Sequence, residues 1–157
     1  MNGVTGRMGT NQHLARSILA IREQGGVKLG DGMRLMPEPI LTGRNEEKLK
    51  ALAIEYGVKK YSTDLDAVLA DDSYSIFFDA SGTPYRIGFL ERAIAAGKHI
   101  YCEKPTAVDP SEAFRIAEIA ETAGVKNGTV QDKLWLPGIR AFLKLRDEGS
   151  TAVGFSQ

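Results

Sequence analysis

Three glycines, Gly3, Gly6 and Gly9, recur at every third position just before an amphipathic helical pattern. Glycine has no Cβ, so the backbone can turn tightly at such positions and approach a bound group closely. Backbone amides around Arg7 and Met8, where the helix begins, would then point at an anion. The pattern predicts a turn that holds a diphosphate, and the alternative is a glycine-rich loop that binds nothing.

A second candidate turn follows a short predicted strand at 39–42. In dinucleotide-binding folds an acidic residue at this place accepts a hydrogen bond from the ribose 2′-hydroxyl, but here the strand runs into Gly43, Arg44 and Asn45. Arg44 offers a planar cation that suits a 2′-phosphate, and Thr42 and Asn45 offer neutral donors. We therefore expect NADP to be the preferred cofactor, with NAD possible. The alternative is that Arg44 is simply solvated.

A third candidate turn, Glu103-Lys104-Pro105, follows a predicted buried strand at 99–102. Ligands of open α/β sheets bind at the carboxyl ends of the strands, so Lys104 is expected where a substrate lies. A lysine there can polarise a substrate oxygen or relay a proton, which makes Lys104 the candidate catalytic residue. The alternative is a solvated surface pair.

Short β-like runs alternate with helical runs along the whole chain. Such alternation implies parallel strands joined by right-handed crossovers, and it predicts a doubly wound parallel α/β sheet of the Rossmann type. The segment 25–39 is expected to be an irregular surface excursion. The expected helices are 10–24, 46–56, 65–70, 85–96, 110–123 and 137–148, and the expected strands are 39–42, 60–62, 75–80, 99–102 and 125–130.

The start of the chain leaves little room for a strand. A phosphate-binding glycine turn normally follows one, yet only Met1 and Asn2 precede Gly3. We expect the sheet to lack its first strand and the chain to be a fragment, a naturally short domain being the alternative. Residues 1–130 are expected to form a dinucleotide-binding domain. Residues 131–157 are expected to be a linker helix and the truncated start of a missing C-terminal substrate domain.

Charge and composition exclude several kinds of partner. The 157 residues carry 20 Lys plus Arg and 20 Asp plus Glu, so no general attraction to nucleic acid or to an anionic membrane is expected. No apolar run approaches the roughly 20 residues that cross a bilayer. The single Cys102 cannot form an internal disulfide, which suits a reducing cytoplasm, and we interpret it as a small buried hydrophobe.

The remaining polar residues form no second site in the sequence. His13 is interpreted as structural or solvent-facing and His99 as a packing residue, and no spacing of His, Cys, Asp or Glu predicts a metal centre. Asp79, at the end of the strand 75–80, is expected either to orient the loop 81–83 or to cap the next helix.

The stretch 97–105, taken with Thr83-Pro84 and the glycine turn, resembles the Gfo/Idh/MocA family from about Gly3 to about Glu148. The resemblance implies an NAD(P)-dependent oxidoreductase that acts on a sugar, cyclitol or related polyol by hydride transfer. It also implies that the turn of Gly6 and Gly9 holds the cofactor pyrophosphate and that Thr83 and Pro84 lie beside the cofactor.

The same resemblance assigns roles to the third turn. It implies that Glu103 and Lys104 face the nicotinamide and the substrate, with Lys104 assisting the substrate oxygen. It further implies a cis bond between Lys104 and Pro105, because before proline the cis form is only about 0.5–1 kcal/mol less stable than the trans form.

The resemblance also implies a C-terminal α/β domain that supplies most substrate contacts and a further catalytic residue, and on which homo-oligomers rest. Because this chain does not contain it, the alternatives are a non-catalytic dinucleotide-binding fragment and a nonfunctional truncated product. The segment Gly6-Arg7-Met8-Gly9 also resembles the nucleotide turn of dihydrodipicolinate reductases, which would bind NADP.

Overall fold

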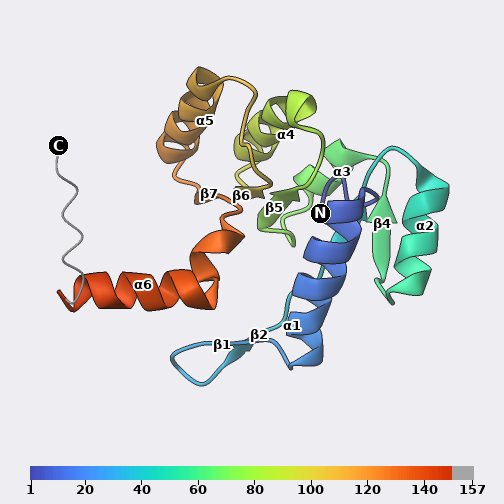
Figure 1. Ribbon diagram of the computed structural model, residues 1–157. Coiled ribbons are helices and arrows are strands. Elements are labelled where there is room, and N and C mark those ends of the chain that lie inside the picture. Colours follow the sequence, from blue (N-terminus) through green and yellow to red (C-terminus); the bar gives the residue numbers. More distant parts are fainter. Residues whose placement is uncertain (150–157) are drawn as a thin grey trace.

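The computed structural model describes residues 1–149 as strands alternating with helices (Figure 1). The last part of the region expected to begin a second domain, 150–157, lies outside the described residues. The strands are β1 (Val27–Lys28), β2 (Arg34–Leu35), β3 (Ile40–Thr42), β4 (Lys60–Ser62), β5 (Ile76–Asp79), β6 (His99–Cys102) and β7 (Asn127–Thr129). The helices are η1 (Gly9–Leu19), α1 (Ala20–Glu23), α2 (Glu46–Glu55), α3 (Leu65–Ala70), α4 (Thr83–Ala95), α5 (Pro110–Thr122), η2 (Asp132–Trp135) and α6 (Pro137–Asp147).

The main sheet is parallel throughout. Strand β3 pairs with β4, and β5 pairs with β6, which pairs in turn with β7. Asn2 joins these two parts through parallel bridges to Thr42 in β3 and Asp79 in β5. The spatial order is therefore β4, β3, Asn2, β5, β6, β7, and the prediction of a doubly wound Rossmann-type sheet is confirmed.

Met1 and Asn2 occupy the centre of this sheet at the end where the glycine turn begins. The Asn2 amide donates to the Phe78 carbonyl oxygen at 2.8 Å, and the Asn2 carbonyl accepts from the Ala80 amide at 2.9 Å. The Met1 amine donates to the Ile40 carbonyl oxygen at 2.7 Å, and burial lowers the pKa of this amine to about 5. Between β3 and β5 the described residues thus supply one bridging residue and no full strand.

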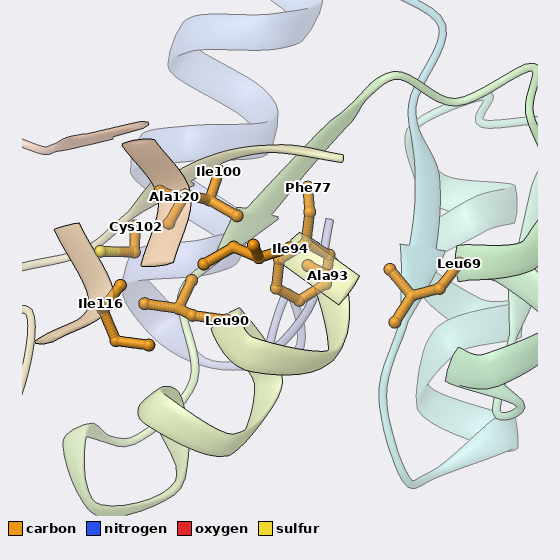
Figure 2. Close-up of a cluster of buried hydrophobic side chains, with 9 residues drawn as sticks. All are labelled: Leu69, Phe77, Leu90, Ala93, Ile94, Ile100, Cys102, Ile116 and Ala120. Carbon is orange, nitrogen blue, oxygen red and sulfur yellow. The ribbon is translucent and has the colours of Figure 1, made fainter. Parts of the chain in front are cut away.

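Two apolar clusters cover the two halves of the sheet. In the first cluster α4 and α5 lie side by side (Figure 1), and their side chains meet those of β5 and β6 (Figure 2). The second cluster packs η1 and α2 against β3. The buried members of the first are Leu69, Phe77, Leu90, Ala93, Ile94, Ile100, Cys102, Ile116 and Ala120, and those of the second are Val4, Leu14, Leu41, Leu49, Ala53 and Val58.

The helix that follows the glycine turn differs in type from the one expected. It is a π-helix over Gly9–Leu19, preceded by the helical residues Arg7 and Met8 and followed by the α-helix Ala20–Glu23. Its two buried residues are Gly9, which packs against the glycine turn, and Leu14, which joins the second apolar cluster. Such helices are rare and are frequent at functional sites.

The segment expected to be irregular contains a small antiparallel hairpin. Val27 pairs with Leu35 and Lys28 with Arg34, and Gly32 adopts a φ of 84° in the connecting loop. Both strands have two residues and are exposed on both faces. No apolar alternation was therefore present in the sequence to indicate them.

Helices η2 and α6 follow β7, and α6 extends away from the sheet (Figure 1). Neither helix contains a buried residue. Within residues 1–149, no helix combines the length and the apolar character needed to cross a membrane.

Candidate functional site

Four turns meet at one edge of the sheet because all its strands run in the same direction. They follow Asn2, β3, β5 and β6, which are the carboxyl ends at which ligands of open α/β sheets bind. The three turns singled out in the sequence are among them.

The glycine turn is crowded on its inner side and open at its middle. Gly3 has a φ of 71°, and a Cβ there would lie 2.5 Å from the Ser81 backbone nitrogen. A Cβ on Gly9 would lie 2.7 Å from the Gly3 carbonyl oxygen, whereas one on Gly6 would meet nothing closer than that oxygen at 3.5 Å. Gly3 thus packs the turn against the backbone of the loop after β5, and Gly9 packs it against its own backbone, whereas Gly6 leaves space for a close ligand.

The start of η1 is accessible. No side chain caps it at Met8, and both Arg7 and Met8 are exposed. The positive end of the helix dipole and the exposed turn before it can therefore face an anion. Together with the space at Gly6, these features fit the pyrophosphate of a dinucleotide.

The turn after β3 carries an exposed cation. Arg44 is exposed, and the Asn45 side-chain oxygen accepts from the Lys48 amide at 2.9 Å, which caps α2. Thr42, expected to offer a donor, is buried, and its hydroxyl donates to the Met1 carbonyl oxygen at 3.1 Å. Arg44 and the Asn45 amide nitrogen remain as the groups that can meet a ribose substituent.

A buried carboxylate organises the turn after β5. The Asp79 side chain is inaccessible to solvent, and its Oδ1 accepts from the Asn2 side-chain nitrogen Nδ2 at 2.8 Å. Its other oxygen accepts from the Ser81 hydroxyl at 2.8 Å and from Arg86 Nε at 3.0 Å. Of the two roles expected for Asp79, orienting the 81–83 loop is therefore the observed one, since the N-cap of α4 is Gly82 and has no side-chain cap.

Arg86 links this loop to the third turn. It extends from the first turn of α4 and is 2% exposed. Besides Asp79, its guanidinium donates to the Ser81 carbonyl oxygen at 2.5 Å and to the Pro105 carbonyl oxygen. The planar fork of five N–H donors suits such a multiple contact. We did not predict Arg86 from the sequence, although a carboxylate ending a buried strand signals that a partner cation is needed.

Glu103 and Lys104 take different environments in the third turn. Glu103 is buried, with one oxygen against His13 Nε2 at 2.6 Å and the other accepting from the Lys104 amide at 2.9 Å. The Lys104 side chain is exposed, and the Lys104–Pro105 bond is cis, as expected. Lys104 is therefore the accessible charge of this turn.

The other candidate residues are also placed. Thr83 and Pro84 form the first turn of α4, next to the loop that Asp79 orients. Cys102 is 1% exposed, and burial raises the pKa of its thiol, as its interpretation as a buried hydrophobe requires. Within residues 1–149, no group of three or more His, Cys, Asp or Glu side chains gathers as a metal centre would need.

Parallel strands with an open glycine turn before a helix define a nucleotide-binding Rossmann protein. The family model described as "Oxidoreductase family, NAD-binding Rossmann fold" matches residues 39–130, more than half of the chain. The chain belongs to this family, Gfo/Idh/MocA.

Three relatives illustrate the similarity. The D-xylose dehydrogenase of Paenarthrobacter nicotinovorans is 53% identical over 95% of this chain and 38% of its own length. The D-xylose 1-dehydrogenase (NADP(+)) 2 of Haloferax volcanii is 28% identical over 54% of this chain and 26% of its own. A solved levoglucosan dehydrogenase, in complex with NADH and levoglucosan, has a TM-score of 0.81 at 20% identity over 96% of this chain and 39% of its own. The chain thus spans about two-fifths or less of each.

Proposed function

We propose that this chain is the cofactor-binding part of an NAD(P)-dependent oxidoreductase that transfers hydride to or from a carbon of a sugar, cyclitol or related polyol. One observation carries the proposal. The glycine turn and the Glu103–Lys104 turn flank β5 at the same sheet edge and are tied to its loop through Asp79 and Arg86. The similarity to a D-xylose dehydrogenase supports a sugar as the substrate.

Different residues of this sheet edge would bind the cofactor and the substrate. When bound, a nicotinamide dinucleotide supplies the carbon that accepts or donates the hydride. Gly6, Gly9 and the helix start around Arg7 would hold its pyrophosphate, and Thr83-Pro84 would lie beside it. These residues fit the role because Gly6 has no Cβ and leaves open space in the turn where a pyrophosphate can lie close to the backbone.

Lys104 would act on the substrate. Its ammonium group is exposed and has no hydrogen-bond or ion-pair partner within residues 1–149. Its amide is fixed by Glu103 and its turn by Arg86, so the backbone that carries it is held in place. A positioned lysine can polarise the substrate oxygen and hold or release its proton.

The glycine turn gives the test of cofactor binding. Gly6→Ala is expected to leave the free energy of unfolding unchanged but to weaken dinucleotide binding, because its methyl group enters the open space of the turn. Gly9→Ala is the comparison, and its Cβ meets the Gly3 carbonyl oxygen and the Val4 Cα. It is expected to lose about 1–3 kcal/mol of stability as well. Urea unfolding and calorimetric titration with NADP and NAD measure both quantities. Wild-type affinity in Gly6→Ala would contradict the assignment.

Arg44 gives the test of the cofactor's ribose. We propose NADP as the preferred cofactor, because an exposed arginine and no carboxylate follow β3. Arg44→Ala is then expected to weaken NADP binding about 10- to 100-fold, the value of a charge-assisted hydrogen bond, and to leave NAD binding nearly unchanged. Arg146→Ala, an exposed arginine on α6, is the matched control. Equal losses for the two dinucleotides would refute the preference.

Turnover is tested on the full-length protein with aldoses and cyclitols as substrates and NADP or NAD as the oxidant. Formation of reduced nicotinamide with one of them supports the proposal. Saturable dinucleotide binding by the 157 residues, with no turnover by the full-length protein, would instead favour a binding role. We also propose a cytoplasmic location, because Cys102 is a buried free thiol and the cytoplasm keeps thiols reduced.

A further inference from the structure

The contact between His13 and Glu103 joins two parts of the molecule that are far apart in sequence. His13 Nε2 lies 2.6 Å from Glu103 Oε1, across 90 positions of the chain. The side chains are 14% and 9% exposed, so water competes little for the contact. A carboxylate only accepts hydrogen bonds, and the imidazole Nε2 therefore donates.

The Glu103 carboxylate contacts both His13 and the Lys104 backbone. Its second oxygen accepts from the Lys104 backbone amide at 2.9 Å. The His13 ring also lies against Phe78 of β5, with ring centroids 4.6 Å apart. The imidazole is thus held on one side by an aromatic ring and bound on its edge to the group that restrains the Lys104 backbone.

The helix that carries His13 is the helix that begins at the glycine turn. Gly9 opens η1, and His13 lies about one turn further on, on the same π-helical segment. A displacement of the helix start would therefore act on the Glu103 carboxylate through the His13 hydrogen bond. The His13–Glu103 contact thus links the turn that would hold the pyrophosphate to the turn that carries Lys104, in addition to the link through Asp79 and Arg86.

We propose that His13 is a positioning residue, which sets the Glu103 carboxylate and through it the placement of Lys104 relative to the bound dinucleotide. The inference rests on the proposed function, because it assumes that Lys104 meets the substrate. His13 itself touches neither substrate nor cofactor in this assignment. Its role is the donated hydrogen bond, so an amide side chain of similar reach should replace it and an apolar one should not.

The test compares His13→Leu, which removes the donor, with His13→Gln, which keeps one. His13→Leu is expected to lower kcat of the full-length protein on the order of 10²-fold, as small misplacements of a catalytic group do, while dinucleotide affinity changes little. His13→Gln is expected to recover most of kcat. His99→Leu is the matched control, since His99 accepts from the Lys126 amide at 3.2 Å, remote from this contact.

Hydrogen exchange supplies a readout that does not depend on turnover. The Lys104 amide is expected to exchange faster in His13→Leu than in the wild type and in His13→Gln, with no change in His99→Leu. The positioning role would be overturned if the Lys104 amide exchanged at the wild-type rate in His13→Leu, or if the leucine and glutamine variants lost protection of this amide equally. A wild-type protein that turns over neither aldoses nor cyclitols but shows the exchange pattern would contradict the proposed function and leave the effect of His13 on the Lys104 backbone standing.

Discussion

Replacing Arg86 by leucine is expected to destabilise the fold by about 3–5 kcal/mol, because the change leaves the Asp79 carboxylate charged and buried without its partner. Asp79 is wholly inaccessible and Arg86 is 2% exposed, so water cannot take the place of the guanidinium. The Ser81 and Pro105 carbonyl oxygens lose their donor in the same step. Urea unfolding of the variant and the wild type measures the difference.

A second arginine of α4 serves as the matched control. Arg92 pairs with Asp66 at the surface, where both side chains are exposed, so Arg92→Leu is expected to cost about 1 kcal/mol or less. Adding Asp79→Asn to Arg86→Leu removes the uncompensated charge and is expected to recover part of the loss. Equal destabilisation by Arg86→Leu and Arg92→Leu would show that the buried pair does not organise these turns.

Replacing Lys104 by methionine is expected to lower kcat of the full-length protein by about 10²- to 10⁴-fold, the usual range for a positioned proton-transfer group. Methionine keeps much of the length of the side chain and removes only the ammonium group. Because Lys104 is exposed and Glu103 binds its backbone amide, the free energy of unfolding should stay unchanged. Dinucleotide affinity should change little, since the pyrophosphate is assigned to another turn.

The comparison for Lys104 is Lys50→Met, an exposed lysine on α2. It should match the wild type in both turnover and stability. If Lys104→Met retains wild-type kcat, the substrate oxygen is handled elsewhere and the role of Lys104 is refuted. A loss confined to KM would assign Lys104 to substrate binding and not to the reaction.

Local signals were sufficient for most elements of this fold. Helix α5 begins at Pro110 after the capping Asp109 and ends before Gly124, as its sequence indicates. The strand 99–102 and the cis bond at Pro105 also agree with expectation. The hairpin 27–35 was missed because strands of two exposed residues leave no periodic pattern. The π-helical form of η1 was missed because the apolar spacing of Leu14, Ile18 and Ile21 indicates a helix but does not distinguish its type.

The sequence by itself determined the alternation of strands and helices, the glycine spacing and the Glu-Lys-Pro turn, since propensity and turn chemistry act between near neighbours. Only the tertiary structure decided which polar groups became partners. Asp79 meets Arg86 and Asn2, and His13 meets Glu103, because parallel crossovers bring distant strand ends to one edge. Such pairings depend on distances in three dimensions, which a one-dimensional pattern does not contain.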